Sequence, residues 1–318
     1  MRKNSTKLII LAVIALIFIA LFCLYNIRGG FSYAFPRRVE RVVAMIITGT
    51  AIAFATVIFQ TVTHNRLLTP SMMGVDSMYQ VVQTVIYFVF GSASILVVSR
   101  YLNFGIAIVA MVLFALILYR FLFRADKHPI FLLLLAGMII GTLLGSLVTF
   151  LQVIIDPVEY DALQSRLFAS FMNVKTELVL ISAVILIICF VVGYRMLHQL
   201  DVMSLGRDNA LNLGVNYDKI VLNVLILSSI LIATSTALVG PVTFLGLIVS
   251  NLAYQYFATY KHTVLIAGAS LISIIALVGG QFLVQHVFHL STTISVIINL
   301  VGGLYFIYLI LKESRKAA

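Results

Sequence analysis

The sequence predicts an all-α fold, that of a polytopic helical membrane protein with about ten transmembrane helices. Of its 318 residues, 62% are hydrophobic and 10% are charged, and the mean hydropathy is +1.13, values that a soluble domain does not carry. The apolar runs are too long, and alternate too little, to be strands of a membrane barrel. A helix satisfies its backbone hydrogen bonds within its own segment, as lipid requires, so we predict that the spans are helices.

Ten apolar segments joined by short polar connections make up one predicted transmembrane permease domain, residues 1–318. A helix of about 20 residues crosses a hydrocarbon core of about 30 Å at a rise of about 1.5 Å per residue. The third segment has the least defined end, because Gly91, Ser92 and Arg100 lie near it, so nine spans remain an alternative. The predicted spans are 8–27, 42–63, 77–98, 104–123, 130–155, 177–195, 219–239, 241–257, 263–287 and 293–311.

The first two spans differ in how the chain enters and leaves them. The basic start followed by an apolar run resembles a signal peptide, but the run is longer than a signal core and no small-residue cleavage site follows it, so we interpret it as a retained helix. The second span follows an arginine-rich segment and ends in a polar turn that contains Pro70, a residue that stops helices. We therefore expect residues 38–76 to join a basic loop on one face to a turn on the other.

Basic residues set the expected orientation. With a cytoplasmic amino terminus, fourteen of the 21 Lys and Arg residues fall on the inner side, as the positive-inside rule requires. We predict a multi-pass protein of the bacterial cytoplasmic membrane with both termini in the cytoplasm and with lipid as its surroundings. The net charge of +10 reflects this loop topology, and the chain has no basic, aromatic-rich soluble domain that would indicate nucleic acid.

The outer loop 28–41 breaks this trend, since it holds four of the seven outer basic residues. One interpretation is that arginines at a helix end reach toward lipid headgroups. The other is a basic surface that meets an acidic partner outside the cell. Its candidate residues are Arg37, Arg38 and Arg41.

Acidic residues and nucleotide motifs limit the function. All eleven acids, Asp76 among them, are predicted to lie in loops or at span ends, which argues against a proton-coupled or sodium-coupled transporter, because such proteins usually need an intramembrane carboxylate. The chain has no Gly-Lys dipeptide and therefore no P-loop. Cys23 and Cys189 lie inside apolar segments, and we predict no metal site, no cofactor and no enzymatic activity. If transport is driven, the energy must come from another subunit.

Two stretches are candidates for packing or coupling. Gly137, Gly141 and Gly145 share one face of the fifth span; close helix packing is the favoured interpretation, and a lining for a translocation path is the alternative. The inner loop 198–218 is predicted to form a short helix, a turn and a second short helix, with Asp201 or Ser204 as a cap. A solvated loop is the alternative there.

The order and spacing of several motifs resemble those of the FecCD-type permeases, the iron-siderophore and vitamin B12 class of ABC importers, over nearly the whole chain. Four groups carry the likeness: Arg38-Val39-Glu40-Arg41 with Gly49 and Gln60; Asn65-Arg66-Leu67-Leu68-Thr69-Pro70 with Gly74; Ser204-Leu205-Gly206, Ala210 and Leu213-Gly214-Val215; and Gly240 with Phe244-Leu245-Gly246-Leu247-Ile248-Val249. The sequence departs from the family pattern at a few positions: Glu40, Arg66, Ser250, Asn251 and Gln285. The N-R-L-L-T-P-S variant is similar to a Gram-positive subgroup for ferric catecholate or carboxylate siderophores, some of which pair two different permeases.

The resemblance implies a BtuC-like permease without chemistry of its own. Its expected partners are a cytoplasmic ABC ATPase dimer, a second permease subunit, identical or different, and an extracellular or periplasmic siderophore-binding protein. By resemblance, Arg38 and Arg41, with Arg37, would dock the binding protein. The coupling loop would contact the ATPase through Asp201, Ser204, Leu205, Gly206, Arg207, Leu211 and Gly214.

The sequence thus predicts a permease subunit of an ATP-driven importer of ferric siderophores, forming half of the translocation pathway. A vitamin B12 or haem permease of the same architecture is the alternative within the family. A secondary transporter, or a structural membrane protein without transport, is the alternative from another class. The specificity of the binding protein discriminates the first alternative, and copurification of an ATPase discriminates the second.

Overall fold

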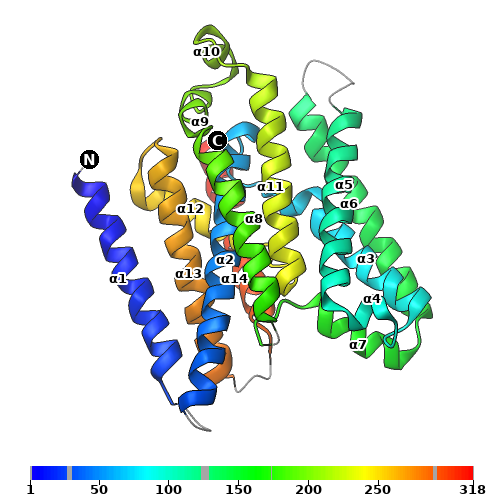
Figure 1. Ribbon diagram of the computed structural model, residues 1–318. Helices are drawn as coiled ribbons and strands as arrows, with labels where there is room; N and C mark the ends of the chain where they lie inside the picture. The colour runs from blue at the N-terminus through cyan, green and yellow to red at the C-terminus, as the bar shows by residue number, and fades with distance from the viewer. Residues whose placement is uncertain (1, 27–30, 123–128, 173, 289–291, 318) are drawn as a thin grey trace.

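The computed structural model describes residues 2–26, 31–122, 129–172, 174–288 and 292–317, and over these ranges it contains helices and no strands. The all-α membrane fold is confirmed (Figure 1). The helices are α1 Arg2–Leu24, α2 Phe31–Thr63, η1 Pro70–Met73, α3 Val75–Phe90, α4 Ile95–Val98, α5 Arg100–Leu122, α6 Pro129–Ile154, α7 Pro157–Leu167, α8 Thr176–Tyr194, α9 Leu197–Met203, α10 Arg207–Asn212, α11 Tyr217–Val239, α12 Leu245–Phe257, α13 His262–His286 and α14 Ile294–Ala317.

Within the described ranges, eight helices are long and apolar enough to cross a membrane: α1, α2, α5, α6, α8, α11, α13 and α14. The predicted span 77–98 falls on α3, which has only 16 residues, and on the separate short helix α4. The predicted span 241–257 falls on α12, which has 13 residues. Residues 27 and 123, the ends of two predicted spans, lie outside the described residues. Helix α1 begins and α14 ends on the face that also carries α9 and α10, which we call the terminal face (Figure 1). The opposite face carries α4 and α7.

Helix α2 is the centre of the bundle. It packs against α13, α11, α12 and α8, and nearly every residue from Ala44 to Val62 is buried. The helix is apolar on all sides, as a helix in the middle of a membrane protein must be. With 33 residues it spans about 50 Å, so it links the two faces of the molecule.

The start of α2 corrects the prediction of an outer loop over residues 28–41. The helix already begins at Phe31 and includes Pro36 and all three candidate arginines. Charge and proline made this segment look like a loop, but it is helical and packs against the end of α1.

Two breaks explain why α3 and α12 are short. Gly74 (φ 85°) precedes α3, and Gly240 (φ 102°) follows α11, and both conformations favour glycine. Gly74 lies against Gly141, near the middle of α6, so α3 starts inside the bundle and not at its surface. The connection before α3 is held by Gln60, whose side-chain nitrogen donates to the carbonyl oxygens of Arg66 (2.8 Å) and Leu68 (3.2 Å).

Candidate functional site

Arg38 caps α1 and is not part of the open surface. Its side chain is only 7% exposed, and its guanidinium group donates to four carbonyl oxygens at the end of that helix. Carbonyl groups in the last turn of a helix have no partner within the helix and carry partial negative charge. The four bonds reach Phe22 (3.0 Å), Cys23 (3.4 Å), Tyr25 (2.7 Å) and Asn26 (3.2 Å). The sequence predicted that Arg38 docks a partner, but its guanidinium group is already bound to these carbonyl oxygens.

Arg37 and Arg41 are the accessible arginines of this motif. The exposed Arg37 stacks on the ring of Tyr33 at 4.4 Å, and the half-buried Arg41 lines a small cavity with Arg37, Glu40 and Arg100. The cavity has a volume of about 230 Å³. Its single acid, Glu40, accepts a hydrogen bond from Thr176 at 2.9 Å.

Sequence reasoning missed Arg100 as a member of this surface. It lies at the start of α5, and it also lines a second cavity of about 400 Å³ on the same face. That cavity adds Arg166 and the two tyrosines Tyr79 and Tyr87. The sequence placed Arg100 near the end of the third predicted span, but its closeness to the α2 arginines depends on how α5 packs.

The three glycines of α6 have two different environments. A Cβ atom on Gly137 would lie 3.2 Å from the Cα of Met73, and one on Gly141 would lie 3.1 Å from the Cα of Gly74. These two positions therefore permit close packing of α6 against η1 and α3. Gly145 has open space around its Cα, and the hydroxyl side chains near it, Thr142, Ser146 and Thr149, are exposed.

Those hydroxyl groups donate to carbonyl oxygens one turn earlier in α6. The donor–acceptor distances are 2.9 Å for Thr142, 3.0 Å for Ser146 and 3.1 Å for Thr149. Because each hydroxyl is satisfied within its own helix, this face can lie against lipid, water or another subunit without an unpaired donor. It is the one predicted pathway segment that the fold leaves open.

Asp76 lies at a helix end, as predicted, but that end is buried and not in a loop at the surface. It lies in the first turn of α3, which begins inside the bundle, and its side chain is buried. One carboxylate oxygen accepts from Thr236 of α11 at 3.1 Å, and the other accepts from Thr243, just before α12, at 3.2 Å. The carboxylate thus joins the start of α3 to the end of α11 and to the connection before α12.

On the terminal face, α9 and α10 form the expected pair of short helices. The chain turns at Gly206 (φ 98°) and Gly214 (φ 81°), neither of which has another residue packed against it. Leu205, Leu211 and Leu213 are exposed at 58%, 43% and 63%. Three exposed leucines close together on a projecting pair of helices are typical of a surface that a partner covers.

The other predicted residues of this segment have structural contacts. Ser204 donates to the carbonyl oxygen of Asp201 at 2.6 Å, and Arg207 lies over the ring of Tyr217 at 5.7 Å. The sequence predicted that Asp201 or Ser204 caps one of the short helices, and this prediction was wrong, because neither α9 nor α10 has a side-chain cap. Asp201 is within α9, and its carboxylate accepts from the backbone nitrogen of His262, the first residue of α13.

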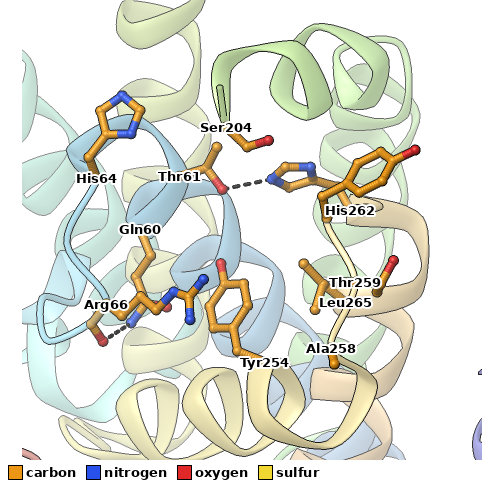
Figure 2. A pocket seen from close by; sticks show the side chains of 11 residues that line it. Gln60, Thr61, His64, Arg66, Ser204, Tyr254, Ala258, Thr259, His262 and Leu265 are labelled. Atoms are coloured by element: carbon orange, nitrogen blue, oxygen red, sulfur yellow. Dashed lines mark hydrogen bonds between the residues drawn. The ribbon is translucent and has the colours of Figure 1, made fainter. Parts of the chain in front are cut away.

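A cavity of about 720 Å³ lies beside this contact on the terminal face (Figure 2). The end of α2, the end of α9 and the turn between α12 and α13 surround it. Its polar walls include Arg66, which stacks on Tyr254 at 4.5 Å, and Gln60, whose side-chain oxygen has no hydrogen-bond partner. The lining residues are Gln60, Thr61, His64, Arg66, Ser204, Tyr254, Ala258, Thr259, Tyr260, His262 and Leu265.

Comparisons with known proteins show similarity over nearly the whole chain. The model of the FecCD transport family matches residues 8–312. The chain is 50% identical over 314 residues to the petrobactin import system permease protein YclO of Bacillus subtilis (strain 168), which covers 99% of each chain. It is 39% identical over 277 residues to the petrobactin import system permease protein FatC of Bacillus anthracis, covering 87% of this chain and 78% of FatC.

Two further similarities are to another permease and to a solved structure. A second Bacillus anthracis protein, the petrobactin import system permease protein FatD, is 28% identical over 265 residues, covering 80% of this chain and 76% of FatD. A solved structure described as an inward-facing metal-chelate type ABC transporter superposes with a TM-score of 0.83 at 24% identity, covering 97% of this chain and 99% of that one.

Proposed function

Because this chain belongs to the FecCD transport family, we propose that it is the permease subunit of an ATP-driven importer of ferric siderophores. The observation that carries the proposal is the match over 99% of both chains to a petrobactin import permease. A second petrobactin permease, FatC, supports the same class of substrate. Vitamin B12 and haem are therefore less favoured as substrates than a siderophore of the petrobactin kind.

The terminal face is proposed to be cytoplasmic and to bind the ATPase. The α9–α10 pair projects from it, and the exposed Leu205, Leu211 and Leu213 provide apolar anchors for a groove on the partner. The excess of Lys and Arg in the loops on this side agrees with that orientation. In this proposal ATP hydrolysis takes place in the ATPase, and the helices of the permease move and line the translocation pathway.

The opposite face is proposed to bind the extracellular solute-binding protein. Arg37 and Arg41 line a cavity with Arg100, so three guanidinium groups lie close together around one acid, Glu40. Such a surface complements carboxylates on a partner and raises the rate of encounter. Arg38 supports the surface by fixing α2 against α1.

The pathway is proposed to run along the open face of α6, between this chain and a second permease. Gly145 and its neighbouring hydroxyl groups provide a narrow, polar face on an otherwise apolar helix. FatC and FatD are two different petrobactin permeases of one organism, and this chain is more similar to FatC (39%) than to FatD (28%). We therefore favour a heterodimer with a FatD-like partner.

A secondary transporter is the second candidate, and the buried carboxylate of Asp76 is the observation that favours it. Uptake of radiolabelled iron in cells with and without this gene, over a panel of siderophores, tests the proposed function. We expect uptake of petrobactin-type ferric siderophores to depend on the gene and on the ATPase. Gene-dependent uptake that persists without the ATPase would favour the secondary transporter.

A further inference from the structure

A close contact between the Asp201 carboxylate and the His262 imidazole joins α9 to α13. The Nδ1 atom of His262 lies 2.5 Å from Oδ1 of Asp201. The imidazole is 2% exposed and the carboxylate 21% exposed, so the contact lies under the surface of the terminal face. A hydrogen bond that involves an ionised carboxylate is stronger than a bond between two neutral groups.

The same carboxylate caps the transmembrane helix. No side chain at the start of α13 caps it, because the preceding residue is Lys261. Oδ1 of Asp201 accepts instead from the backbone nitrogen of His262 at 2.8 Å. A carboxylate at a helix amino terminus satisfies a free N–H group and interacts favourably with the helix dipole. The cap of α13 therefore comes from α9.

The imidazole continues the connection into α2. Its Nε2 atom shares a hydrogen bond with Oγ1 of Thr61 at 2.7 Å (Figure 2), and the Thr61 hydroxyl also lies 3.0 Å from the carbonyl oxygen of Val57. Thr61 lies in the last turn of α2, the helix whose other end holds the arginine surface. One chain of contacts thus runs from α9 through α13 to the central helix.

We propose that Asp201, His262 and Thr61 are positioning residues that couple displacement of α9 to movement of α13 and α2. This inference rests on the proposed function, in which the ATPase binds the α9–α10 pair. The buried residues of α9 are apolar: Leu197, Leu200 and Met203. Apolar contacts tolerate sliding, whereas the hydrogen bonds of Asp201 fix α9 in register with the first turn of α13. The cavity beside His262 leaves room for α9 to shift.

The test separates binding of the ATPase from coupling. In the assembled complex, we would compare Asp201→Ala, Asp201→Asn and Thr61→Val with the parent, and measure ATPase copurification, ATP hydrolysis and uptake of ferric petrobactin in vesicles. Asp218→Ala is the matched control, because Asp218 is an exposed carboxylate on the same face at the start of α11.

We expect Asp201→Ala to retain the ATPase and hydrolysis but to lower uptake per ATP hydrolysed roughly tenfold, a typical coupling between sites. Asp201→Asn, which keeps an acceptor oxygen, should restore part of the uptake per ATP hydrolysed. Asp218→Ala should show the same uptake per ATP hydrolysed as the parent. Because Asp201 and Thr61 act through one imidazole, their double variant should lose less than the product of the single effects.

Three results would overturn the inference. They are a parental value of uptake per ATP hydrolysed in Asp201→Ala, a loss in the double variant equal to the product of the two single effects, and a loss of ATPase binding in proportion to the loss of uptake. The last result would make Asp201 a residue of the docking surface. If Asp201→Ala does not fold, Thr61→Val decides, since it removes one hydroxyl at nearly constant volume and should also lower uptake per ATP. A parent complex without ATP-driven uptake would instead remove the proposed function itself.

Discussion

Arg38 of α2 donates to the carbonyl oxygen of Phe22 in α1 at 3.0 Å, with three further carbonyl oxygens of that helix end within hydrogen-bond distance. The contact fixes the outer end of the central helix against α1. Its neighbours in the sequence, Arg37 and Arg41, are more exposed and line the cavity of the opposite face. One motif thus combines a structural arginine with two that remain accessible to a partner.

Replacing Arg38 by Met should destabilise the protein. The change removes the donors for several helix-end carbonyl groups and leaves these groups unpaired, which should cost about 2–4 kcal/mol of unfolding free energy. Thermal unfolding in detergent measures the effect. Arg37→Met is the matched control and should change the stability little, because Arg37 is exposed. Equal stabilities of the two variants would show that the α1 contacts contribute nothing.

Reversing both Arg37 and Arg41 to Glu should weaken association with the binding protein. Exposed charge pairs contribute only about 0.2–1 kcal/mol each, so the double variant is more informative than either single one. Its residual affinity should also depend less on salt. Binding measured at low and high ionic strength checks this, with Arg120→Glu on the terminal face as control. Parental affinity at low ionic strength would assign these arginines to lipid contacts.

Replacing Gly206 by Val should impair the α9–α10 pair. Gly206 has a φ of 98° and a ψ of 163°, a region that costs a residue with a side chain about 1–3 kcal/mol. We expect weaker copurification of the ATPase, or hydrolysis without uptake. Gly303→Val is the control, because Gly303 is helical and has open space around it. Normal coupling in the Gly206 variant would count against this segment as the docking element.

Two glycines of α6 should respond differently to the same change. Gly141→Val should lower stability, because the new side chain would meet the backbone of Gly74 at 3.1 Å. Gly145→Val should leave stability unchanged and reduce uptake, since it narrows an open face. Unfolding curves and transport rates measured on both variants separate packing from passage. Normal uptake by a stable Gly145→Val variant would exclude this face from the pathway.

The membrane spans and the α9–α10 pair could be predicted from local pattern. A span needs a long apolar run because lipid offers no partner for the backbone, and Gly206 and Gly214 mark the turns of the short helices. The start of α2 could not be predicted, because Pro36 and the arginines resemble a loop until α1 is seen beside them.

Contacts between distant parts of the chain could not be predicted from the sequence either. Asp201 and His262 are 61 residues apart, and no pattern in either segment links them. The burial of Asp76 could not be predicted, because it depends on the packing of Gly74, just before α3, against the middle of α6. Such features depend on tertiary packing, which residue spacing does not encode.

The central claim is that ATP hydrolysis by a separate subunit drives siderophore uptake through this chain. The most direct test is accumulation of ⁵⁵Fe-loaded petrobactin in vesicles that contain this permease, its partner permease and the ATPase, with the binding protein outside. We predict accumulation that requires ATP and is abolished when a catalytic-site variant of the ATPase is used. Accumulation driven by a proton or sodium gradient in the absence of ATP would contradict the account.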